Sequence, residues 1–150
     1  MPNPPTPLLP EIALVTASVM PKPDRDTVFL VAELANLGIR AAILAWDAPI
    51  SWAAIPLVVL RTPWDYVQRW NEFLSWATDT DSKTHVINPL PLVRWNAHKG
   101  YLLELSVRGV PIVPTDLCRP GDPVKQGWLA KQFRNDSEFV VKPAMSSGAG

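Results

Sequence analysis

The sequence predicts an α/β fold with an open, mostly parallel sheet. Two observations lead to this prediction. Short apolar runs, typical of strands buried on both faces, alternate along the chain with segments whose apolar residues recur at helical spacing. The first strand–helix–strand unit takes about 35 residues, enough for a right-handed crossover between two parallel strands.

This first unit covers residues 11–46. Residues 11–17 (EIALVTA) predict a buried strand, and residues 39–46 predict a second one. Between them, Asp24 is a good helix N-cap, and Gly38 is typical of the position just past a helix end. The apolar residues of this helix share one face: Val28, Val31, Ala32, Leu34 and Ala35.

Two further strands and a helix follow. Residues 56–61 predict a third strand, and residues 85–88 predict a short fourth one that ends before Pro89. Thr62-Pro63 is typical of a helix start, so residues 62–78 predict a single helix. Its apolar face consists of Val67, Trp70, Phe73, Leu74 and Ala77.

The last third of the chain is interrupted more often. Asn96 is a typical N-cap and Gly109 a typical helix end, which predicts a helix between them. Residues 110–115 predict an edge strand because two prolines interrupt them. Residues 122–133 indicate another helix, and residues 138–143 predict a strand that leads into a loop of small residues.

Composition excludes several classes of function. The 150 residues carry 14 basic and 14 acidic side chains with no basic stripe, so nucleic acid is not an expected partner. Apolar runs are far shorter than about 20 residues, which argues against a membrane span. The N-terminus lacks the pattern of a secretory signal, and one cysteine forms no internal disulfide; we therefore expect a cytoplasmic protein. Neither histidine has partners at metal-ligand spacing.

The C-terminal loop carries the clearest chemical signal. Lys142 ends the predicted strand, and small residues with donor groups follow it: Ser146, Ser147, Gly148, Ala149 and Gly150. Glycine lets backbone N–H groups approach an anion, and lysine adds the charge that phosphate oxygens favour. Lys99 falls in the predicted first turn of a helix, where a cation is unfavourable unless an anion binds beside it. An ordinary turn and a solvated lysine are the alternatives.

Together these motifs resemble those of ATP-grasp ligases. The resemblance lies in Asn-x-x-Lys-x-x-Leu from residue 96, Gly-Val-Pro-x-x-Pro-Thr from residue 109, Phe-Val-Val-Lys-Pro from residue 139 and Ser-Ser-Gly-x-Gly from residue 146. Residues 59–66 and 86–96 resemble the cycloserine-biosynthesis and bacterial glutathione synthetase-like members.

The resemblance implies roles for particular residues. Lys99, Lys142 and the loop 146–150 would bind the phosphates of ATP, and Arg61 and Asp65 would face the substrate. A local ion pair or a helix cap is the alternative for Arg61 and Asp65. The Mg²⁺ ligands of such enzymes would lie beyond residue 150.

The same resemblance implies a domain organisation. We expect a proline-rich leader (1–10), a Rossmann-like substrate domain that precedes the ATP-grasp domain (11–95), and the truncated beginning of the ATP-grasp lid (96–150). The predicted function is the N-terminal portion of an ATP-dependent ligase. It would form an amide-type C–N bond on a small amino-acid-like substrate through an acyl phosphate. Ligase and cyclo-ligase chemistry both remain open.

The resemblance to ATP-grasp ligases implies that the 150-residue chain alone is inactive. It would act with a completing C-terminal domain or as a homo-oligomer. The alternative hypothesis is a non-catalytic α/β binding or interaction module. Nucleotide binding would separate the two hypotheses.

Overall fold

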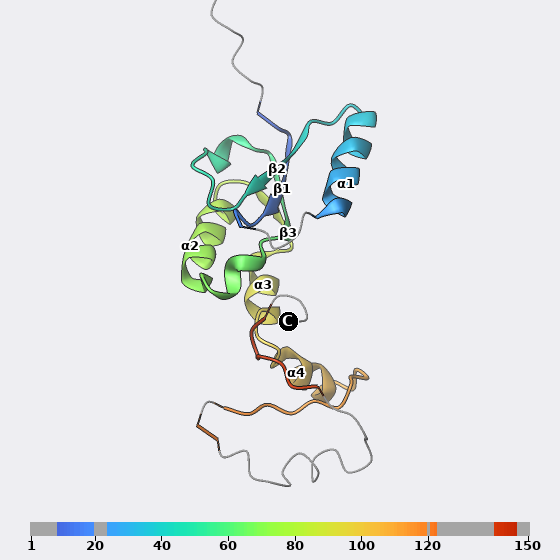
Figure 1. Cartoon of the computed structure of the whole chain (residues 1–150), viewed down its shortest axis with the longest axis vertical. Helices are drawn as coiled ribbons and strands as arrows, with labels where there is room; N and C mark the ends of the chain where they lie inside the picture. The colour runs from blue at the N-terminus through green and yellow to red at the C-terminus, as the bar shows by residue number, and fades with distance from the viewer. Residues whose placement is uncertain (1–8, 20–23, 120, 123–139, 147–150) are drawn as a thin grey trace, which may run out of the picture. The chain divides into compact units, whose positions relative to one another are not determined.

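The computed structural model describes residues 9–19, 24–119, 121–122 and 140–146 (Figure 1). The chain divides into two compact units, residues 1–93 and 94–150. The predicted assignment of substrate and nucleotide domains to the two parts of the chain stays a prediction. Among the described residues, no helix has the length and apolar character needed to cross a bilayer.

The first unit is built on a four-stranded, all-parallel sheet with the order β2-β1-β3-β4. The strands are β1 (Ile12–Thr16), β2 (Ala41–Ala45), β3 (Leu57–Thr62) and β4 (His85–Ile87). The register aligns one residue from each strand in a row across the sheet: Ile43, Leu14, Val59 and Ile87. The predicted α/β fold with an open parallel sheet is confirmed.

Helices α1 (Arg25–Asn36) and α2 (Trp70–Asp81) lie on opposite faces of this sheet (Figure 1). Asp24 caps α1 as predicted, because its carboxylate accepts hydrogen bonds from the Thr27 backbone N–H (3.4 Å) and hydroxyl. Gly38 follows the helix with φ 77°, a backbone conformation that glycine adopts without strain. Both ends of α1 are therefore set by local sequence.

The hydrophobic core lies on the α2 face and is largely aromatic. Trp46 contacts Phe73 edge to face at 5.7 Å, and Trp52, from the short 3₁₀ helix η1 (Trp52–Ala54), contacts Trp76 at 5.1 Å. Aliphatic residues of the strands and Ile55, which follows η1, complete the cluster. The strand residues are Ala13, Val15, Val58, Leu60 and Val86. Apolar side chains of this size contribute most of the burial that stabilises the unit.

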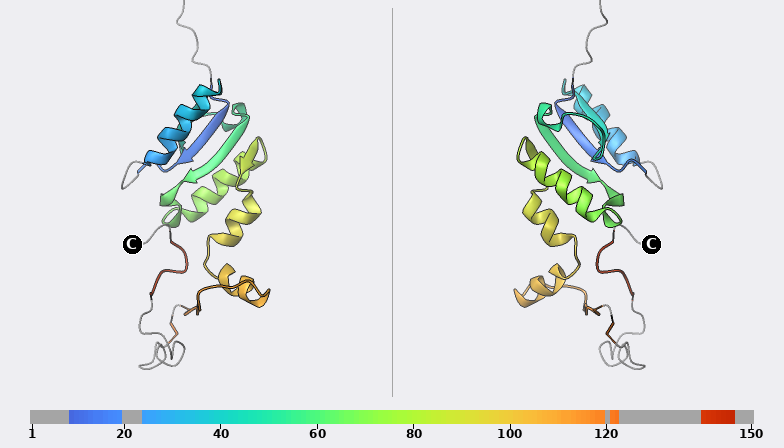
Figure 2. Two further views of the ribbon diagram at one scale, coloured as in Figure 1. Left: turned by 90° about the vertical axis from the view of Figure 1, so that its right-hand side faces the viewer. Right: turned by 90° about the vertical axis from the view of Figure 1, so that its left-hand side faces the viewer.

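The other face is covered only in part. Figure 2 shows α1 along one side of this face, where it does not lie over β3. The prediction that the second strand is buried on both faces is wrong, because the strand order places β2 at an edge, where Ile43 is 41% exposed. The apolar face predicted for α1 is also only partly buried. Three of its members are exposed: Val28, Ala32 and Ala35.

The single helix predicted over residues 62–78 is in fact two elements. A 3₁₀ helix, η2 (Trp64–Val67), comes first, and α2 begins at Trp70. The interruption places Asp65 and Arg69 at the end of β2, where both side chains form hydrogen bonds. The predicted apolar face is otherwise confirmed in its centre, since Phe73 and Ala77 are buried.

The second unit differs more from the sequence prediction. Asn96 ends a helix, α3 (Leu90–Asn96), instead of capping one, and α4 (Tyr101–Val107) begins after a turn. The turn forms because the His98 Nδ1 atom accepts a hydrogen bond from the Gly100 N–H (3.1 Å). Lys99 therefore lies before α4 and not in its first turn. Gly109, with φ 77°, follows the end of α4 as predicted.

The two strands predicted in the second unit are not formed by its described residues. Residues 110–115 are irregular, since Pro111 and Pro114 lack the N–H groups that a ladder needs. Residues 140–143 are likewise not in a strand, and 138–139 lie outside the described residues. The predicted helix over 122–133 lies outside them as well, apart from Asp122.

The structure predicts a stabilising substitution in α2. Thr80 is 1% exposed, and its hydroxyl has no hydrogen-bond partner among the described residues. Thr80→Val keeps the side-chain shape and removes this unsatisfied group, so we expect a gain of about 1 kcal/mol in the free energy of unfolding, measured by urea denaturation. Thr78→Val is the control, because the Thr78 hydroxyl is exposed and donates to the Leu74 carbonyl (2.7 Å). Equal effects of both variants would contradict the prediction.

Candidate functional site

The carboxyl ends of the parallel strands meet at one edge of the sheet. The chain passes from β1 to β2 on one side and then crosses to β3 on the other side of β1, so the strand order reverses between β1 and β3. Open α/β sheets bind ligands outside the carboxyl edge at such a reversal. At this point the Thr62 hydroxyl donates to the Thr16 hydroxyl (3.0 Å), which joins the two strand ends.

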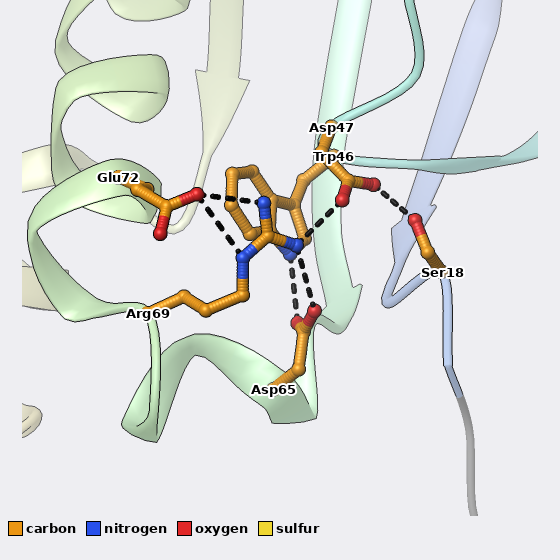
Figure 3. Close-up of polar contacts among 6 residues, drawn as sticks. All are labelled: Ser18, Trp46, Asp47, Asp65, Arg69 and Glu72. Carbon is orange, nitrogen blue, oxygen red and sulfur yellow. Dashed lines mark hydrogen bonds and ion pairs between the residues drawn. The ribbon is translucent and has the colours of Figure 1, made fainter.

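A polar cluster stands at this edge (Figure 3). We call it the Arg69 cluster, and it consists of Ser18, Trp46, Asp47, Asp65, Arg69 and Glu72. The Arg69 guanidinium binds the carboxylates of Asp47 (2.5 Å) and Glu72 (2.8 Å) and lies 3.4 Å from that of Asp65. It also lies over the Trp46 ring, 4.3 Å from the ring centroid, and Trp46 Nε1 donates to Asp65 (2.7 Å).

These contacts shift the pKa values of Arg69 and Asp47. Hydrogen bonds to Glu72 and Asp47 raise the pKa of Arg69 above its ordinary value. The hydrogen bond from Arg69, followed by the one from the Ser18 hydroxyl, lowers the pKa of Asp47 below its ordinary value of 3.8. Three carboxylates thus share one guanidinium.

Arg61 and Asp65, the two predicted substrate residues, are not bound to each other. Asp65 has both oxygens engaged inside the Arg69 cluster, by Trp46 and by Arg69. Arg61 is exposed near the carboxyl end of β3 and alternates with the buried Leu60 and Thr62, so it belongs to the α1 face. Its charge contributes to lowering the pKa of Asp24, although the Thr27 hydroxyl is the main cause.

Sequence reasoning missed Asp47 and Arg69. Asp47 directly follows a predicted strand, so its position at the carboxyl edge was available from the sequence. Arg69 lies four residues after Asp65 and three before Glu72, a spacing typical of ion pairs on one helix face. The pairing between Arg69 and Asp47 spans 22 residues and has no local signal.

In the second unit, Lys99 meets the beginning of the small-residue loop. Its ammonium donates to the Pro143 carbonyl (3.0 Å) and to the Ser146 hydroxyl (2.5 Å), and its backbone N–H donates to the Ala144 carbonyl (2.7 Å). Two predicted nucleotide-binding residues, 47 positions apart, are thus in direct contact. Lys142 is exposed, and residues 147–150 lie outside the described part of the chain.

The described residues contain no group of three or more His, Cys, Asp or Glu side chains arranged to hold a metal ion. The carboxylates of the Arg69 cluster already surround a cation of their own.

The lowered pKa of Asp47 predicts a pH-dependent stability. Asp47→Asn should lose about 1.5 kcal/mol of unfolding free energy at neutral pH, because it removes charge from the hydrogen bonds with Arg69 and Ser18. A carboxyl group whose pKa is lowered by folding stabilises the folded state fully at pH values above its ordinary pKa of 3.8. This stabilisation disappears as the pH falls through the lowered pKa of the folded state. Thermal midpoints of wild type and variant should therefore converge in acid.

Asp79→Asn is the matched control for this experiment. The Asp79 carboxylate also binds a cation, Lys83 (2.6 Å), but in an exposed i,i+4 pair. Such pairs contribute about 0.5 kcal/mol or less. If the difference in thermal midpoint between wild type and Asp47→Asn stayed constant from neutral pH to acid, the lowered pKa of Asp47 would be contradicted.

Comparisons with known proteins identify the family. Residues 12–88 match the family described as the N-terminal domain of the D-cycloserine synthetase DcsG. The cycloserine biosynthesis protein DcsG of Streptomyces lavendulae is 37% identical over 136 residues, which cover 88% of this chain and 45% of that protein. The crystal structure of D-cycloserine synthetase DcsG superposes with a TM-score of 0.67 at 35% identity and covers 82% of this chain and 40% of that one.

The chain thus spans less than half the length of the relatives it matches. The family match covers all four strands of the sheet and the whole Arg69 cluster. The chain therefore belongs to the family of the N-terminal domain of D-cycloserine synthetase DcsG.

Proposed function

We propose that this chain is the N-terminal part of an ATP-dependent ligase of the ATP-grasp type, which closes a C–N bond on a small amino-acid-like substrate. The observation that carries the proposal is the 37% identity with a cycloserine biosynthesis protein over 88% of the chain. A match of this extent includes residues of both compact units. The proposal therefore has a substrate side, in the first unit, and a nucleotide side, in the second.

The nucleotide side is built around Lys99. An ammonium group has three N–H donors, and the Pro143 carbonyl and Ser146 hydroxyl accept two of them. Both acceptors are neutral, and a charged phosphate oxygen is a stronger acceptor than either. An incoming phosphate would therefore compete well for the Lys99 ammonium, with Lys142 and the loop 146–150 as further proposed donors.

When bound, ATP would supply the phosphoryl group that converts the substrate carboxylate into an acyl phosphate, from which an amine displaces phosphate. The residues of this chain would hold the phosphate charge and bring donors to it. Ligands for Mg²⁺ are not among the described residues, so we propose that they come from another part of the enzyme.

The substrate side is built around Arg61. Its guanidinium is exposed near the carboxyl end of β3. It lies close enough to the start of α1 to contribute to the lowered pKa of Asp24. An arginine and the N-terminal end of a helix both favour an anion, and a substrate carboxylate fits that preference. Asp65, whose oxygens are engaged by Trp46 and Arg69, would position this edge from within the Arg69 cluster.

The nucleotide side predicts a lysine-dependent affinity for ATP. Titration of ATP into the whole chain by calorimetry should show binding, and Lys99→Met should weaken it about 10- to 100-fold. This range corresponds to the loss of one charge-assisted hydrogen bond, worth about 1.5–3 kcal/mol. Lys83→Met is the control, since Lys83 is bound to Asp79 in the first unit, and should leave the affinity unchanged.

Two results would count against the proposal. Absence of ATP binding would favour a non-catalytic α/β binding module. ATP binding that is equally strong in Lys99→Met and wild type would place the nucleotide elsewhere. Circular dichroism of both variants checks that neither substitution has unfolded the chain.

A further inference from the structure

The free edge of β2 is unusually open to pairing with another strand. β2 consists of five apolar residues, Ala41–Ala45, with no charge, proline or bulge. Natural edge strands are commonly protected by such features, or by being very short. At the opposite edge, β4 has three residues and is followed by Asn88 with φ 68° and by Pro89. In the sheet formed by the described residues, the β2 edge therefore offers the longer row of backbone groups.

The backbone hydrogen bonds show which groups of β2 point outward. The Arg40 carbonyl accepts from Ile12 N–H (3.1 Å), and Trp46 N–H donates to the Thr16 carbonyl (3.0 Å), so even-numbered residues of this strand face β1. Because successive residues alternate, the N–H and C=O groups of the odd-numbered residues point to the free edge: Ala41, Ile43 and Ala45. The Ala45 carbonyl also accepts from Ala48 N–H (3.0 Å), which leaves it one further lone pair.

We propose that two copies of this chain dimerise through β2, antiparallel about a two-fold axis at Ile43, so that their two sheets become one. In this register Ile43 lies opposite Ile43 of the second copy, and Ala41 lies opposite Ala45. All three pairs are then of the hydrogen-bonded kind, because they involve only outward-pointing residues. A strand that pairs with itself in this way satisfies the requirement of a two-fold interface.

The side chains beside the strand fit the same partner. Ile43, which is 41% exposed, would pack against its own copy. Among the strands, α1 contacts chiefly β2, and it exposes three apolar residues of its own: Val28, Ala32 and Ala35.

The charges at the ends of β2 are compatible with the antiparallel arrangement. Arg40 precedes the strand and Asp47 follows it. Antiparallel pairing about Ile43 places Arg40 opposite Trp46 of the second copy and next to its Asp47. Both side chains are already paired within their own copy, Arg40 with Glu11 (3.5 Å) and Asp47 with Arg69 (2.5 Å), so this register brings no unpaired like charges together.

Light scattering after size-exclusion chromatography tests the proposal. Over a concentration series, wild type should approach twice the chain mass, and Ile43→Lys, which sets two cations face to face on the axis, should remain at the single-chain mass. Ile87→Lys is the matched control: Ile87 lies in the same row of the sheet, at the other edge, and is 42% exposed. It should dimerise like wild type. A wild type that is monomeric throughout, or equal loss of dimer in both variants, would overturn the proposal.

A cross-linking experiment tests the register without destabilising the strand. In a Cys118→Ser background, which removes the exposed native thiol, Ile43→Cys should form a disulfide-linked dimer on mild oxidation. Hydrogen-bonded antiparallel pairs have Cα atoms about 5.5 Å apart, within the range that a disulfide spans. Ile87→Cys should cross-link at least tenfold more slowly. Equal rates for the two cysteines, or cross-linking only of Ile87→Cys, would show association through another surface.

Discussion

A parallel sheet is stable only when both of its faces are covered, because its strands are apolar on both sides. This chain covers the two faces unequally. On one face, α2 and η1 pack an aromatic cluster onto β1 and β3, with Phe73 at its centre. On the other face, α1 lies chiefly over β2, and the row from Ile43 to Ile87 is buried only at its centre. The position of the core and the exposure of Arg61 follow from this asymmetry.

The Arg69 cluster connects the covered face to the carboxyl edge. Its guanidinium lies on Trp46, which belongs to the core, and binds carboxylates from the loop after β2, from η2 and from α2. One cation thus fixes three segments that local structure does not hold together. Without it, three carboxylates would face one another beside an aromatic core, a costly arrangement at neutral pH. The cluster gives the edge a defined shape, whatever ligand binds there.

The proposed reaction divides its tasks between the two compact units. The carboxyl edge of the sheet, with Arg61, belongs to the first, and the contact between Lys99 and Ser146 belongs to the second. Membership in the DcsG N-terminal domain family rests on the first unit, where residues 12–88 match. The proposed use of ATP rests on the arrangement of Lys99 and on the resemblance of the motifs in the second unit, and the nucleotide experiment tests it there.

The sequence by itself determined the α/β alternation, β1, β3 and both ends of α1, because apolar runs, the Asp24 cap and Gly38 act through neighbours in the chain. It indicated Lys99 and Ser146 as one site through resemblance, and the structure places them in contact. Only the tertiary structure decided that β2 lies at an edge and that Arg69 joins Asp47 to Asp65. Strand order and long-range ion pairs depend on residues brought together by folding, and no local pattern specifies them.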